Sequence, residues 1–284
     1  RDDKAKKERE QVLKDITLGQ FFPGDSPLHK LDPRTKLILT TVYIILVFVA
    51  RGAPGFAVIL LFTLAMIAAS KIPAKIILRG LRPLVFIITF TAIINLFWTK
   101  GENLLFRLGF IEIYSEGVLY AVLMVLRVVL LLLGSSVLLT YTTSPIALTD
   151  GLEQLLSPLK KLRVPVHEFA MMMTIALRFI PTLIEETDKI MNAQKARGVD
   201  FSSGGIIRRA KALIPILIPL FVSAFRRADE LAIAMECRCY RGGEGRTRMK
   251  VLKLSYRDLV ASVIFVFFTA AVIAANVFIP WLSV

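Results

Sequence analysis

Five long stretches without a charged side chain divide this sequence, and they set its fold class. They run over residues 37–50, 52–70, 83–99, 128–149 and 259–284. A membrane-spanning helix needs roughly 20 mostly apolar residues, and flanking Lys or Arg can extend it because their long stems reach the interface. The pattern therefore predicts spans at about 35–51, 53–70, 83–99 and 118–142, and a final transmembrane helix within 255–284.

The segment between the fourth and fifth spans has a different pattern, in which apolar residues recur at helical spacing beside polar ones. Ser144 and Pro145 suit the cap and first position of one helix. The pattern predicts a second helix over about 166–196 and a third over about 203–237. The fold class is therefore an all-α polytopic membrane protein, with about five transmembrane helices and a cytoplasmic domain of three amphipathic helices.

The apolar faces of the second and third amphipathic helices are candidate contact surfaces. These apolar parts are too short and too interrupted to span, so we expect them at the membrane interface or against protein. The run Met171-Met172-Met173 indicates either an adaptable contact surface or a Met-rich core between helices. The candidate interface residues are Phe169, Met172, Met173, Ala176, Ile214, Leu217, Ile218 and Phe221.

These elements divide the chain into four parts. We expect a polar N-terminal extension at 1–17, a membrane domain at 18–143, a cytoplasmic or interfacial domain at 144–254, and the final transmembrane helix at 255–284. The extension is charged and compatible with a helix, and we assign no role to it.

Composition and charge agree with a membrane protein and predict its orientation. Hydrophobic residues make up 55% of the chain and charged residues 20%, with a mean hydropathy of +0.65 and a net charge of +14. Basic side chains concentrate before the first span, between the second and third, and within 144–254. The positive-inside rule places these segments and the N-terminus in the cytoplasm, and an odd number of spans leaves the C-terminus outside. Cys237 and Cys239 then lie in a reducing compartment, where a structural disulfide is not expected.

The sequence contains no constellation for catalysis, so we expect a protein that is not an enzyme. It has no G-x-x-x-x-G-K-[ST] loop for nucleotide phosphates, no acid pair and no Ser/His/Asp set. Cys237 and Cys239, without a nearby His or a second Cys pair, make a poor zinc site. We therefore expect no metal site and no cofactor in this chain.

Arg127 is the candidate polar residue inside the membrane. An ionisable side chain within a span costs about 2.5–3.5 kcal/mol on insertion scales and so marks a functional candidate. It pairs with a polar group of the bundle such as Asn95, or with another protein, or else it lies near the outer interface.

The second and third amphipathic helices end alike. Ala196-Arg197-Gly198 closes one and Cys237-Arg238-Cys239 closes the other, so each ends on an Arg between small side chains. The helix dipole favours a cation at this end, and Gly198 suits a left-handed cap. An Arg can form forked hydrogen bonds to a carboxylate, and small neighbours let it enter a groove. One such end would be ordinary capping, but two equivalent ends predict a partner with two equivalent grooves.

These paired ends resemble the X-Arg-X motifs of the transmembrane (T) component of energy-coupling factor (ECF) transporters, the EcfT/CbiQ-like family. GDSPLHKLDPR, from Gly24 to Arg34, is similar to that family's N-terminal segment, and GGEGRTR, from Gly242 to Arg248, to its stretch after the second motif. The resemblance covers the chain from about residue 18 to the end. Cys flanks Arg238 where Ala and Gly are usual, but Cys is also small.

The resemblance implies a non-catalytic subunit of an ATP-driven importer in the plasma membrane of a prokaryotic cell. Two ABC-type ATPase subunits, identical or different, would each receive one Arg tip and would bind ATP and Mg²⁺ themselves. A separate membrane protein, the S component, would capture a vitamin or related micronutrient and contact the apolar faces of these coupling helices. The implied ATPase-binding residues are Ala196, Arg197, Gly198, Cys237, Arg238 and Cys239.

Three other functions stay open on the sequence. The T component of a dedicated cobalt or nickel importer would be related to this family. A self-contained secondary transporter would bind substrate between repeats near the midplane, but the spans offer few polar groups and no inverted repeat. A membrane-anchored nucleic-acid binder would use the basic 144–254 region. Its modest, mixed-sign charge fits anchoring to the lipid bilayer better, so we expect no nucleic-acid partner.

Overall fold

The chain forms two compact units in the computed structural model. The structure describes residues 21–50, 52–98, 104–108, 111–199, 201, 205–243 and 252–278. Residues 19–154 and 251–284 form one unit, here called the membrane unit, and residues 155–250 belong to the other, the coupling unit. The predicted extension at 1–17, the glycine-rich stretch beyond Gly243 and the last residues of the final helix lie outside the described residues.

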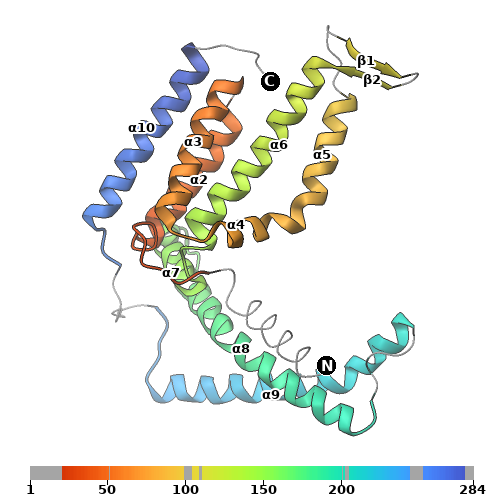
Figure 1. Cartoon of the computed structure of the whole chain (residues 1–284). Coiled ribbons are helices and arrows are strands. Elements are labelled where there is room, and N and C mark those ends of the chain that lie inside the picture. Colours follow the sequence, from red (N-terminus) through yellow and green to blue (C-terminus); the bar gives the residue numbers. More distant parts are fainter. Residues whose placement is uncertain are drawn as a thin grey trace. The chain divides into compact units, whose positions relative to one another are not determined.

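Helices make up almost all of the membrane unit, which confirms the predicted all-α class. In Figure 1, α2, α3, α6 and α10 run side by side, and α5 lies next to α6. The chain turns between α4 and α5 at a 3₁₀ turn, Arg82–Leu84, that contains Pro83. A π-helical turn, Ser136–Thr140, continues α6. The helices are α2 (Pro33–Val49), α3 (Gly52–Ser70), α4 (Ala74–Leu81), α5 (Val85–Trp98), α6 (Ser115–Ser135), α7 (Pro145–Leu155) and α10 (Tyr256–Phe278).

Five helical segments among the described residues are long and apolar enough to cross a membrane. They are Gly52–Ser70, Ala74–Trp98, Ser115–Thr140, Val166–Ala196 and Tyr256–Val277. Four of them coincide with the second to fifth predicted spans. The predicted first span is helix α2, whose 17 residues stand at the short end of the range of about 17–25. The remaining segment lies in the coupling unit and has the lowest mean hydropathy, 1.2. The protein is a multi-pass membrane protein.

The core of the membrane unit forms where small residues let α2, α3 and α6 approach one another. Tyr43 is fully buried, and a Cβ atom on Gly134 would come within 2.2 Å of its ring, so only glycine fits there. The Tyr43 hydroxyl donates a hydrogen bond to the Leu130 carbonyl (2.9 Å) and lies 2.7 Å from the Thr63 hydroxyl. Phe62 of α3 stacks on Phe268 of α10, and this contact joins α10 to the core.

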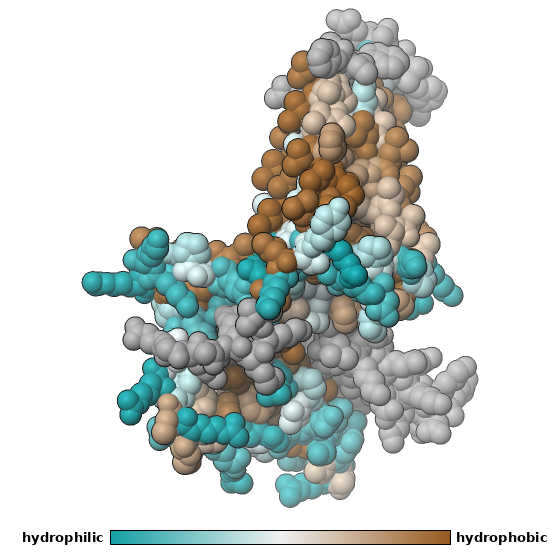
Figure 2. Space-filling view, turned by 90° about the vertical axis from the view of Figure 1, so that its left-hand side faces the viewer, coloured by the Kyte–Doolittle hydropathy of each residue, from teal (hydrophilic) through white to brown (hydrophobic). Residues whose placement is uncertain are grey.

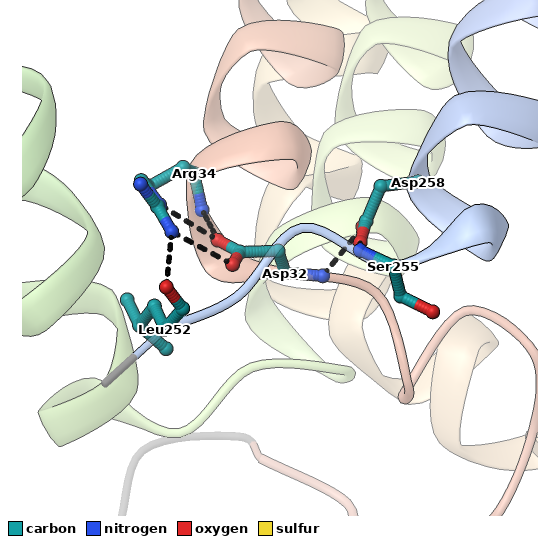
Figure 3. A network of polar contacts seen from close by, with 5 residues as sticks. All are labelled: Asp32, Arg34, Leu252, Ser255 and Asp258. Atoms are coloured by element: carbon teal, nitrogen blue, oxygen red, sulfur yellow. Dashed lines mark hydrogen bonds and ion pairs between the residues drawn. The ribbon is translucent and has the colours of Figure 1, made fainter. Parts of the chain in front are cut away.

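A polar network ties the segment before α2 to the start of α10 (Figure 3). Asp32 caps α2 by accepting the Arg34 amide hydrogen (2.9 Å), and its carboxylate also pairs with the Arg34 side chain. Arg34 donates a hydrogen bond to the Leu252 carbonyl (2.8 Å). Buried Asp258 accepts hydrogen bonds from the amides of Asp32 (2.7 Å) and Ser255 (2.8 Å). The two ends of the membrane unit are thus fastened together through groups far apart in sequence.

Helix α7 begins as predicted, but it belongs to the membrane unit. The Ser144 hydroxyl accepts the amide hydrogen of Ala147 (3.3 Å), which is the predicted cap. A Cβ atom on Gly151 would lie 2.9 Å from the Cβ of Pro33, so the absence of a side chain lets α7 pack on the start of α2. The membrane unit therefore extends past residue 143, to residue 154.

A short β-hairpin precedes α6, and the hydrophobic pattern did not predict it. Strand β1 (Leu104–Leu108) pairs antiparallel with β2 (Ile111–Tyr114), with Leu108 opposite Ile111. Two strands of four or five residues are too short to give a distinct alternating pattern within an apolar chain.

The coupling unit consists mainly of two long helices. A 3₁₀ segment, Ser157–Leu162, leads into α8 (Val166–Ala196), and α9 (Ile206–Cys237) follows. The bounds of α8 agree with the predicted 166–196, and α9 begins three residues later than predicted. The two helices pack against each other.

Candidate functional site

The tip of α8 is built by a complete Schellman motif around Arg197. The amide of Gly198 donates a hydrogen bond to the Lys195 carbonyl (3.0 Å), and the amide of Val199 donates one to the Gln194 carbonyl (3.1 Å). Gly198 adopts φ +88°, the left-handed conformation that this motif requires. Arg197 is therefore the last residue before the chain reverses, and its side chain is exposed.

The tip of α9 repeats this geometry around Arg238. The amide of Cys239 donates to the Glu236 carbonyl (2.8 Å), and the amide of Tyr240 donates to the Met235 carbonyl (3.0 Å). Cys239 takes the left-handed position at φ +56°, where Gly198 stands in the other tip. Arg238, Cys237 and Cys239 are exposed. The structure thus gives the two predicted motifs the same backbone ending, which we call the two arginine tips.

The helices that carry the tips cross at a cluster of three polar side chains. The Arg227 guanidinium of α9 pairs with the Glu186 carboxylate of α8 at 2.6 Å, and the Ser223 hydroxyl donates to the same carboxylate at 2.8 Å. These hydrogen bonds from Ser223 and Arg227 lower the pKa of Glu186, so its carboxylate stays ionised at neutral pH. We call Glu186, Ser223 and Arg227 the crossing cluster.

The crossing cluster lies equally far along each helix from its tip. Glu186 precedes Arg197 by 11 residues, and Arg227 precedes Arg238 by 11 residues. At a rise of 1.5 Å per residue, each tip is about 16 Å from the crossing. Gln194, beyond Glu186 on α8, contacts Pro215, which precedes Arg227 on α9, so the helices run in opposite directions. The two tips therefore project to opposite sides of one crossing.

A second polar contact between α8 and α9 follows from the prolines of α9. Pro219 has no amide hydrogen, so the carbonyl of Pro215 lacks the donor that a helix normally supplies four residues later. The Gln194 side chain donates a hydrogen bond to this carbonyl at 3.4 Å. Pro219 thus leaves a free acceptor on α9, and the hydrogen bond from Gln194 to this acceptor helps to hold α9 against α8.

The apolar side chains of α8 divide between two faces. Ile175, Phe179 and Leu183 face α9 across a cavity of about 270 Å³, with Ala224 and Leu231 among the residues opposite. The eight predicted interface residues lie elsewhere and are all exposed; the exposed fractions of the seven larger ones run from 41% for Met173 to 60% for Ile218 and Phe221. Met172 and Met173 therefore do not form a core between the helices, and they lie on a surface that the described chain leaves uncovered.

Arg127 lies at the turn between α2 and α3. Its guanidinium donates a hydrogen bond to the Ala50 carbonyl (3.1 Å) and lies 5.2 Å from the centre of the Phe56 ring. Asn95 does not pair with it, because the Asn95 side chain donates to the Thr91 carbonyl of its own helix. Since Ala50 ends α2, this geometry favours a position toward one membrane interface over a partner inside the bundle.

The crossing cluster is the part of this site that sequence reasoning missed. Glu186, Ser223 and Arg227 stand in polar stretches where exposed charges are ordinary, and no spacing relates residues on two different helices. Among the described residues, no group of three His, Cys, Asp or Glu side chains is placed to hold a metal ion. His29 orders the segment before α2 through hydrogen bonds with the Ser26 hydroxyl and the Phe22 carbonyl.

The fold and the site define a class: a multi-pass membrane protein that presents two equivalent arginine tips on crossed helices. Comparison with known proteins names the family. The CbiQ family, described as cobalt transport protein, matches residues 24–251. The chain belongs to this family.

Several relatives named energy-coupling factor transporter transmembrane protein EcfT match this chain over nearly their whole length. Their names and this coverage identify the chain as the T component of an ECF transporter, which works in a complex with other subunits. The energy-coupling factor transporter transmembrane protein EcfT of Clostridium kluyveri is 57% identical over 252 residues, covering 88% of this chain and 93% of the relative. EcfT of Ruminiclostridium cellulolyticum is 55% identical and covers 94% of this chain and 100% of the relative. EcfT of Bacillus subtilis is 48% identical, with 87% and 93% covered.

Proposed function

We propose that this chain is the coupling subunit that transmits ATP-driven motion from two ATPase subunits to a substrate-binding S component. The observation that carries the proposal is the duplicated tip. Arg197 and Arg238 end their helices with the same pair of hydrogen bonds, and each is followed by a residue in the left-handed conformation. Two equal ends on one unit suit a partner that offers two equal grooves, such as a dimer of ABC-type ATPases, identical or different.

Each tip would bind its ATPase through the exposed guanidinium. A fixed fork of donors suits a carboxylate on a groove wall, and charge-assisted hydrogen bonds are roughly twice as strong as neutral ones. The flanking residues Ala196, Gly198, Cys237 and Cys239 are small and exposed, so they leave room for a groove wall on both sides of the Arg. ATP and Mg²⁺ would bind the ATPases, and this chain would need no cofactor.

The exposed apolar residues of α8 and α9 would hold the S component. Eight uncovered apolar side chains on two helices are costly to leave in water, because apolar area favours burial by about 25 cal/mol per Å². Methionines within such a surface adapt to different partners. Movement of α8 against α9 about the crossing cluster would then shift both the ATPase tips and the S-component surface.

The proposed setting is the plasma membrane of a prokaryotic cell, with the N-terminus and the coupling unit in the cytoplasm and the C-terminus outside. The cargo we propose is a vitamin or related micronutrient captured by the S component. The description of the CbiQ family as cobalt transport protein supports a second candidate, the T component of a dedicated cobalt or nickel importer. Neither cargo would bind this chain.

Charge reversal at both tips tests the proposal. Arg197→Glu with Arg238→Glu should lower the amount of ATPase that co-purifies with the chain at least about tenfold, because each groove carboxylate would meet a like charge. Transport should be lost while membrane insertion remains. The matched control is Lys189→Glu with Arg226→Glu, which reverses one exposed cation on the shaft of each helix and should retain the ATPases.

Undiminished ATPase binding by the double tip variant would overturn the assignment of the tips. Co-purification of the wild-type chain also separates the other functions. A self-contained secondary transporter would purify alone and would move a solute when reconstituted alone, and a nucleic-acid binder would retain nucleic acid.

A further inference from the structure

The membrane unit contains an apolar groove between α3 and α10. Its volume is about 420 Å³, within the range of about 300–1,000 Å³ typical of ligand sites. Ala65 and Ala69 of α3 and Ala261 of α10 create the hollow, because each is small where a larger side chain would fill it. Leu39 and Leu138 are among the residues that close its back. The groove is unrelated to the arginine tips.

One cation lines this groove at the start of α10. Arg257 is exposed, and within the described part of the chain its side chain has neither a hydrogen bond nor an ion pair. Its neighbour Asp258 is fully engaged in the network of Figure 3, so the backbone that carries Arg257 is held in place. A fixed site thus combines a free guanidinium with an apolar channel.

We propose that this groove binds one anionic glycerophospholipid, with an acyl chain between α3 and α10 and the phosphate on Arg257. Both helices are long and apolar enough to span a membrane, so lipid is the medium that surrounds the groove. Figure 2 faces the side of the membrane unit that carries α10, and the tall upper part of this view is mostly hydrophobic. An Arg at the start of a span lies at the level of the lipid phosphates, with which its fork of donors pairs well.

The length of the groove agrees with this occupant. Its lining on α10 runs from Tyr256 to Phe265, which is about 14 Å at the helical rise. Half of the hydrocarbon core of a bilayer is about 15 Å. An acyl chain that starts at the phosphate level beside Arg257 therefore reaches the end of the groove near the middle of the membrane.

Native mass spectrometry of the full chain in its native complex, with added phosphatidylglycerol or phosphatidylcholine, tests the proposal. The wild type should retain one phosphatidylglycerol in preference to phosphatidylcholine by about fivefold, the ratio expected for one Arg near an anionic lipid. Arg257→Gln should bring this ratio close to one. Lys253→Gln removes an equally exposed cation four residues away and should keep the preference. Ala65→Phe, which fills the groove from its open side, should abolish retention of both lipids.

Several outcomes would overturn the proposal. Equal retention of both lipids by the wild type would show that Arg257 does not bind the lipid phosphate. A preference that Arg257→Gln leaves intact would show the same. Equal losses in Arg257→Gln and Lys253→Gln would indicate diffuse attraction of surrounding lipid only. Loss of another subunit from the complex in Ala65→Phe, with lipid retention unchanged, would assign the groove to protein contact. Arg257→Gln alters an exposed side chain that has no partner within the described residues, so the test does not depend on whether Ala65→Phe folds.

Discussion

Arg197 and Arg238 end their helices in the same way, but the residues that follow them differ in kind. Gly198 adopts the left-handed conformation without strain, whereas Cys239 adopts it with a Cβ atom. A left-handed non-glycine residue costs about 1–2 kcal/mol. The second tip is therefore closed by a residue that the local backbone disfavours, and this strain is confined to one hydrogen-bonded turn.

Cysteine-to-glycine changes at the two sides of Arg238 should have opposite effects. Cys239→Gly relieves the left-handed strain and should slow hydrogen exchange of the amides that close the tip. Cys237→Gly places glycine at the last residue of α9 and should speed exchange there by at most about fivefold, since glycine costs up to about 1 kcal/mol in a helix. Gly198→Ala should likewise loosen the first tip. Faster amide hydrogen exchange in Cys239→Gly than in the wild type would show that the left-handed conformation of Cys239 is not strained.

At the scale of elements, two helices and three polar side chains set where the tips point. Glu186 and Arg227 are partly exposed, so solvent screens their ion pair and the pair adds little to stability. The ion pair instead affects geometry, because it joins α8 and α9 at one point and the Gln194–Pro215 hydrogen bond joins them at a second point. Two such contacts fix the angle between α8 and α9.

Breaking the crossing cluster should therefore widen the range of distances between the tips. Spin labels on native Cys239 and on Val199→Cys, in a Cys237→Ala background, report this distance by electron resonance. Arg227→Gln should broaden the distribution, and Glu186→Arg with Arg227→Glu should narrow it again by restoring the pair in reverse. Arg226→Gln, one residue away and exposed, is the control. Equal distributions in all variants would show that the cluster does not hold the angle.

At the scale of the whole molecule, orientation in the membrane follows from charge rather than from packing. The basic segments lie before α2, between α3 and α5, and in the coupling unit. Cys237 and Cys239 are exposed in the structure, so either thiol can report the side on which the coupling unit lies.

A membrane-impermeant maleimide should label these thiols in inside-out vesicles and not in intact cells. A single Ser115→Cys, at the start of α6 and in a background without the native cysteines, should show the reverse. Labelling of Cys237 or Cys239 from outside intact cells would show that the predicted topology is wrong. The proposed position of the ATPases on the cytoplasmic side would then be wrong as well.

The sequence by itself determined the membrane class, the bounds of α8 and the two arginine motifs, because these depend on local composition, periodicity and capping. Length and apolar content define a span without reference to any other element, and a left-handed residue after an Arg is a property of a few consecutive positions. Only the tertiary structure decided which residues meet across helices. It paired Arg127 with Ala50, Glu186 with Arg227, and Asp258 with Asp32, and local sequence patterns do not predict such contacts because they join residues 41 or more positions apart. It also distinguished the face of α8 that is turned toward α9 from the exposed one, since both faces are apolar and only the position of α9 separates them.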